Sequence, residues 1–107
     1  MTTRAPMRRE DLVRAIADAV QHVPGVARLH PGTIVEAATY YAGGKVVGVR
    51  LADPVEIHIE ADRVPLPPVT AKVVEAARNV LAAAGDDRQV IVVVDEVAEA
   101  ALERRQP

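Results

Sequence analysis

The stretch His22–Gly32, which reads HVPGVARLHPG, decides how this chain folds. It holds two Pro-Gly pairs, Pro24-Gly25 and Pro31-Gly32, on either side of five residues whose apolar and polar side chains can alternate. Proline fixes φ at about −65° and glycine tolerates positive φ, so each pair suits the centre of a type II turn. A helical pattern precedes the stretch and strand patterns follow it. We therefore expect a corner at which the chain turns from a helical layer into a sheet.

Apolar spacing predicts two helices outside this corner. Residues from about 9 to 22 carry their apolar side chains on one helical face, and Pro24 ends that helix because proline disfavours helical geometry in the residue before it. A second amphipathic helix is expected from about residue 69 to 84, after a proline-bearing loop. Residues 1–8 are expected to form a flexible arm, and residues 98–107 a tail that can be helical or fray.

Strands are expected at residues 33–41, 45–51, 55–61 and 90–94. The clearest is Val55–Ala61, where apolar residues alternate with Glu56, His58 and Glu60, so one face belongs to the core and the other to solvent. The first strand is the least regular, because residues 36–38 can instead form a helical turn. Gly43-Gly44 predicts a hairpin turn. The last run, VIVVV, has no polar interruption and suggests a strand covered on both faces.

These elements predict an α+β domain over residues 9–97, in the order α-β-β-β-α-β. The two helices pack on one face of a mixed, mostly antiparallel sheet, and a C-terminal helix can follow. The chain has 107 residues, half of them hydrophobic, with no Phe, Trp or Cys, so the core must be aliphatic. Its net charge of −2 gives no electrostatic reason to bind nucleic acid. No apolar run approaches the roughly 20 residues of a membrane span, so we expect no direct membrane insertion.

The residue inventory offers little for catalysis. The sequence contains no Ser and no Cys, which removes the usual nucleophile arrangements, and it has no glycine-rich phosphate loop. Glu56, His58 and Glu60 form the best candidate for a metal or acid-base cluster because alternate strand residues project together. The competing interpretation is a solvated strand face, since residues two apart lie about 6.5–7 Å from each other. His22 and His30 at the corner are interpreted as polar surface.

Tyr40 and Tyr41 either offer a contact surface or fill the core and its rim. We expect no catalytic residue, no metal and no cofactor. The candidate interaction surface consists of Tyr40, Tyr41, Glu56, His58 and Glu60. The alternative left open is an enzyme that binds a metal or small ligand through Glu56, His58 and Glu60.

The ordered set HVPGVARL, LHPG, VVGVRL, VEIHIEAD and VIVVVDEV resembles the alkaline-shock protein family, also called the envelope-stress-response proteins. More narrowly, it is similar to the short actinobacterial members. The resemblance covers residues from about Asp11 to Val97. It implies a small, non-enzymatic, cytoplasmic protein of cell-envelope homeostasis. Some relatives are held at the membrane by a separate small anchor protein, but this chain lacks the extended tails and the glycine-bearing insert of the longer members.

The resemblance and the inventory together predict a non-enzymatic interaction or scaffold protein linked to the cell-envelope stress response. Its expected partners are proteins, among them a membrane-anchor protein or a family paralogue, and self-association into a homo-oligomer stays open. The expected location is the cytoplasm, with any membrane association made through a partner.

Overall fold

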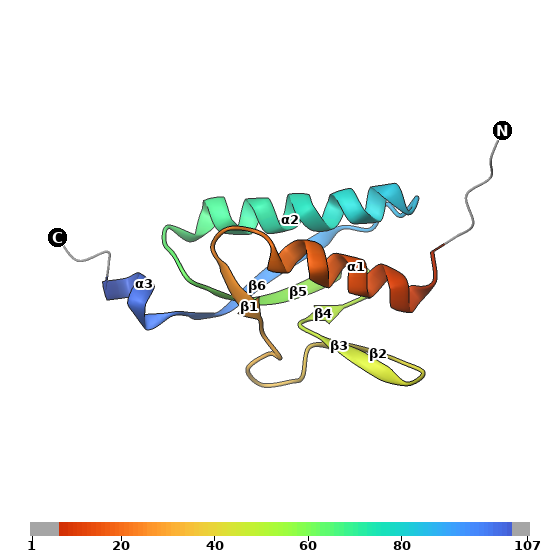
Figure 1. Ribbon diagram of the computed structural model, residues 1–107, viewed down its shortest axis with the longest axis horizontal. Helices are drawn as coiled ribbons and strands as arrows, with labels where there is room; N and C mark the ends of the chain where they lie inside the picture. Colours follow the sequence, from red (N-terminus) through yellow and green to blue (C-terminus); the bar gives the residue numbers. More distant parts are fainter. Residues whose placement is uncertain (1–6, 104–107) are drawn as a thin grey trace.

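Two helices cover one face of a mixed β-sheet in the computed structural model, which describes residues 7–103 (Figure 1). This confirms the predicted α+β class. The elements in chain order are α1 Arg9–Gln21, β1 Val26–Leu29, β2 Ala38–Tyr41, β3 Gly44–Val47, β4 Val49–Arg50, β5 Val55–Ala61, α2 Leu66–Ala83, β6 Val90–Val97 and α3 Glu99–Glu103. Of the predicted arm and tail, residues 1–6 and 104–107 lie outside the described residues.

The main sheet is organised around β5. Strand β6 runs parallel to β5 along its whole length, while β1 and β4 pair antiparallel with different parts of the opposite edge. Strands β2 and β3 form a separate hairpin, with Tyr41 opposite Gly44 at its turn. The hairpin extends away from the main sheet (Figure 1). The predicted hairpin is therefore present, but it does not extend the main sheet.

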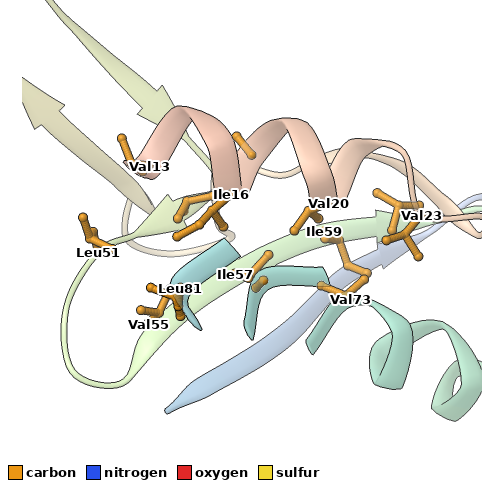
Figure 2. Close-up of a cluster of buried hydrophobic side chains, with 14 of the residues drawn as sticks. Val13, Ile16, Val20, Val23, Leu51, Val55, Ile57, Ile59, Val73 and Leu81 are labelled. Carbon is orange, nitrogen blue, oxygen red and sulfur yellow. The ribbon is translucent and has the colours of Figure 1, made fainter. Parts of the chain in front are cut away.

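The hydrophobic core lies between the helices and the apolar face of β5, as Figure 2 shows. Ile57 and Ile59 of β5 are both 0% exposed and lie against the buried stripes of α1 and α2. Each such side chain contributes about 1.5–3 kcal/mol of hydrophobic stabilisation. The helix residues that complete the core are Leu12, Val13, Ile16, Ala17, Val20, Val69, Val73, Ala77 and Leu81.

The corner after α1 forms as predicted. Val26 N–H donates to the Val23 carbonyl at 3.1 Å, and Gly25 has a φ of 101°. A Cβ atom at Gly25 would lie only 2.7 Å from a methyl carbon of Val69 in α2. The turn therefore packs closely against the first turns of α2, and position 25 has room only for glycine.

Two predicted strands are shorter than expected. The strand expected at residues 33–41 begins only at Ala38, because the Ala37 N–H bonds to the Pro31 carbonyl at 2.7 Å and closes residues 31–37 into a loop. The strand expected at residues 45–51 is interrupted at Gly48, whose φ of 90° is incompatible with continued extended backbone. The corner itself contributes the additional strand β1.

The prediction that residues 90–94 are covered on both faces is wrong. Among the described residues, β6 pairs with β5 alone and therefore lies at a sheet edge. Val90, Val92 and Val94 pack against the core, but Ile91 on the opposite face is 44% exposed.

Replacing Gly25 with alanine tests the corner. We expect Gly25→Ala to lower the free energy of unfolding by about 2–4 kcal/mol, because positive φ and crowding against Val69 add together. Gly85→Ala is the matched control: its φ is 75°, but a Cβ there meets nothing within 4 Å. Gly85→Ala should lower the free energy of unfolding by about 1–2 kcal/mol. The free energies are measured by urea denaturation followed by circular dichroism. Equal decreases in the two variants would contradict the close contact between Gly25 and Val69.

The turn between α2 and β6 predicts a pH dependence. Side-chain hydrogen bonds from Arg88, the shortest at 2.6 Å, together with the Arg88 backbone N–H, lower the pKa of Asp86. The native pKa lies below the unfolded value, so this stabilisation is present above about pH 4 and is lost as the pH falls further. Asp86→Asn should therefore lower the free energy of unfolding by up to about 1 kcal/mol at neutral pH. The difference from the wild type should shrink at acidic pH. The exposed Asp87 supplies the control, Asp87→Asn, and a deficit that persisted at about pH 2 would exclude this explanation.

Candidate functional site

The polar face of β5 is buried, so the prediction of a solvent-exposed face is wrong. Glu56, His58 and Glu60 do share the face away from the helices, but His58 and Glu60 are each only 9% exposed. Side chains from β6, β1 and β4 lie against them. His58 and Glu60 therefore belong to the interior, and the side chain of Glu56, which is 26% exposed, lies at its border.

His58 lies between two carboxylates. Its Nδ1 is 2.7 Å from Asp95 Oδ2 on β6, and its Nε2 is 2.8 Å from Glu56 Oε1 on its own strand. Each ring nitrogen thus lies within hydrogen-bond distance of a carboxylate oxygen. This arrangement fastens β6 to β5 from the face opposite the core.

Asp95 joins three parts of the chain. Besides His58, its carboxylate accepts a hydrogen bond from Thr33 Oγ1 at 3.0 Å and lies 3.6 Å from His30 Nδ1. His30 Nδ1 in turn accepts the Gly32 N–H at 3.0 Å, and its Nε2 lies 3.7 Å from Glu96. His30 therefore belongs to this cluster, contrary to its interpretation as polar surface.

The remaining charges of the polar face are compensated locally. Arg50 of β4 lies 3.7 Å from Glu56, and Arg28 of β1 lies 3.4 Å from Glu60. His22 is 78% exposed at the end of α1, with its ring against the Asp18 carbonyl, and it follows its prediction as polar surface. In the part of the chain that the structure describes, no group of three or more His, Cys, Asp or Glu side chains is placed to hold a metal ion.

Of the two adjacent tyrosines, Tyr41 lies at the rim of the core and Tyr40 lies on the surface. The Tyr41 hydroxyl accepts hydrogen bonds from Arg14 of α1, at 2.9 Å from Nη2, and its half-buried ring packs against the core. Tyr40 is 59% exposed, and its hydroxyl donates to Glu36. Glu36 also pairs with Lys45 Nζ at 2.8 Å. Only Tyr40 offers an open contact surface.

Two exposed apolar side chains were not predicted as surface residues. Ile34 is 96% exposed and Val35 is 68% exposed, at the tip of the loop formed by residues 31–37. Their β-branched character favoured a strand, but the preceding Pro31-Gly32 pair was the signal for a turn followed by a loop. We call Ile34, Val35 and Tyr40 the tip surface.

The outer edge of β6 is a second open surface. In a parallel ladder, alternate residues direct their N–H and C=O toward the neighbouring strand. Val55 N–H donates to the Gln89 carbonyl at 2.8 Å, which sets the phase of the ladder. The backbone groups of Val90, Val92 and Val94 consequently point away from β5.

Comparison with known proteins identifies no relative of this chain. No family model, curated protein or solved structure matches this chain. Within residues 7–103, no helix combines the length and the apolar character that a membrane crossing requires.

His58 should contribute strongly to stability. His58→Ala would leave the carboxylates of Glu56 and Asp95 without the ring between them, and Asp95 is only 7% exposed. We expect the free energy of unfolding to fall by about 2–4 kcal/mol. His22→Ala, the same change at an exposed position, should change it by no more than about 0.5 kcal/mol. If urea denaturation gave similar free energies of unfolding for the two variants, the contacts of His58 with Glu56 and Asp95 would not be stabilising the fold.

Proposed function

We propose that this chain is a non-enzymatic interaction or scaffold protein of the cell-envelope stress response that acts through protein–protein contacts. The observation that carries the proposal is the tip surface, where Ile34 is 96% exposed and Val35 is 68% exposed. Two neighbouring aliphatic side chains held in water favour burial against a partner.

The tip surface is displayed on an ordered loop. The Ala37 N–H bonds to the Pro31 carbonyl, Thr33 bonds to Asp95, and Arg50 Nη2 donates to the Glu36 carbonyl at 3.1 Å. A loop fixed at its base and its sides loses less conformational entropy on binding than a flexible one. This preorganisation supports a role for the loop in recognition.

Tyr40 extends the tip surface onto the hairpin. Its hydroxyl bonds to Glu36 of the loop, and Lys45 Nζ lies 5.4 Å from the centre of its ring. An exposed tyrosine with a fixed ring is a residue type that often dominates binding energy at protein interfaces. The proposal retains Tyr40 from the predicted interaction surface. It leaves out His58 and Glu60, which are buried, and Tyr41 and Glu56, which are partly buried.

The biological setting rests on the resemblance of residues 11–97 to the alkaline-shock protein family. On this basis we assign the chain to the cytoplasm, with membrane association through a partner such as an anchor protein or a family paralogue. The apolar tip surface is suited to such a protein partner, because aliphatic side chains at an interface need a complementary apolar pocket.

The proposal is tested by affinity capture from a bacterial lysate followed by mass spectrometry. The bait carrying Ile34→Asp and Val35→Asp should lose the envelope-associated proteins that the wild type retains, by at least about tenfold, because buried carboxylates oppose binding. Leu102→Asp, a charged substitution at an exposed apolar position outside both the tip surface and β6, is the control and should retain them. Retention of no envelope-associated protein by the wild type would contradict the proposal.

The alternative, an enzyme that binds a metal or small ligand through Glu56, His58 and Glu60, has its own readout. Metal analysis of the purified, folded protein would overturn our proposal if it found a stoichiometric ion that disappears in folded His58→Ala protein. Under our proposal, both proteins have the same metal content.

A further inference from the structure

We propose that the outer edge of β6 pairs with the same edge of a second copy of this chain, in an antiparallel arrangement with a two-fold axis at Val92. The inference concerns a surface and a partner different from those of the tip surface, and it goes beyond the proposed function. It begins from a structural requirement, because backbone N–H and C=O groups at a sheet edge readily pair with another strand.

Strand β6 lacks the features that normally protect an edge. It is eight residues long, and among the described residues it pairs only with β5. Edge strands are usually short or carry charges or proline. Residues 90–94 read VIVVV and contain neither a charge nor a proline. The first protective features, a register shift and acidic side chains, appear only at Asp95 and Glu96.

The phase of the β5–β6 ladder restricts a second copy to registers that set outward-facing residues opposite one another. The outward-facing residues Val90, Val92 and Val94 must form the hydrogen-bonded pairs of an antiparallel ladder. A two-fold axis at Val92 sets Val92 opposite itself and Val90 opposite Val94 of the second copy. Every outward N–H and C=O in this segment then gains a partner inside the same segment. With the axis at a neighbouring residue, one of these valines would instead lie opposite Arg88 or Glu96.

The side chains agree with the same register. Ile91, which is 44% exposed on the face away from the helices, lies opposite Val93 of the second copy. All five residues from Val90 to Val94 are β-branched and meet β-branched partners, a combination that stabilises antiparallel pairs. The segment is therefore complementary to itself.

Charge disfavours the parallel direction. Antiparallel pairing brings Glu96 of one copy toward the Arg88–Gln89 end of the other, and no charged residue lies inside the paired window. Parallel pairing would instead set Glu96 beside Glu96, which is repulsive. Arg88 already binds Asp86 through Nε and Nη2, and its Nη1 lies 3.4 Å from the Ala52 carbonyl, so the repulsion between the two Glu96 side chains is what distinguishes the two directions.

Molar mass in solution tests the dimer. By light scattering after size exclusion at about 100 µM, the wild type should have twice the chain mass of 11.4 kDa. Ile91→Lys should return it to the mass of one chain, because each new lysine would be desolvated against Val93 of the other copy. Ile34→Lys, the same substitution in the tip surface, should remain dimeric. A monomeric wild type, or a dimer unaffected by Ile91→Lys, would overturn the inference.

Single cysteines test the register, because the chain contains no cysteine of its own. Hydrogen-bonded pairs have Cα atoms about 5.5 Å apart, within disulfide range, so Val92→Cys should form a covalent dimer under mild oxidation. Val90→Cys should not, since the two Val90 positions lie about 13 Å apart along the strands. Equal cross-linking of both variants would exclude this register.

The two sets of experiments separate the two ideas. A monomeric chain that still captures envelope proteins through the tip surface contradicts the dimer and leaves the proposed function in place. A dimer that cross-links at Val92 but captures no such protein supports the dimer and contradicts the proposed function.

Discussion

The two-sided burial of β5 is the constraint on which the rest of this structure depends. Ile57 and Ile59 lie under both helices, while His58 and Glu60 on the reverse face are also buried. A strand covered on both faces needs an apolar layer on one side and compensated charges on the other. The helices supply the first. The carboxylate of Asp95 on β6 helps to supply the second, and Thr33 of the loop after β1 donates a hydrogen bond to the same carboxylate.

The sequence predicts the elements whose pattern is local. The alternation of Val55–Ala61, the apolar stripe of α2 and the Pro-Gly corner each depend on residues close together in the chain, and each appears as expected. The cover over the polar face is not local. The partner that covers His58 is Asp95, 37 residues away in the sequence, and no short-range pattern predicts such a partner. The alternation of residues in β5 therefore predicted correctly which side chains share a face, but it predicted wrongly that the polar face is exposed to solvent.

The candidate surfaces show the same division. A β-branched run indicates a strand but does not distinguish a buried position from a sheet edge, so VIVVV was predicted to lie inside. At Thr33–Ala37 the same propensity is overridden by a loop-closing hydrogen bond to Pro31, which leaves Ile34 and Val35 in solvent. Tyr40 and Tyr41 separate because Arg14, on a distant helix, holds only the second ring.

The parallel pairing of β5 with β6 also orders events along the folding pathway. The two strands are joined by the crossover of residues 62–89, so their contact closes a long loop, whereas β4 reaches β5 across a short turn. Loop closure of this kind is entropically costly and slow compared with local pairing. During synthesis the antiparallel half of the sheet emerges first, and His58 acquires its Asp95 partner only when the last strand arrives. The pairing of β6 with β5 thus completes the sheet and brings Asp95 against His58 in the same step.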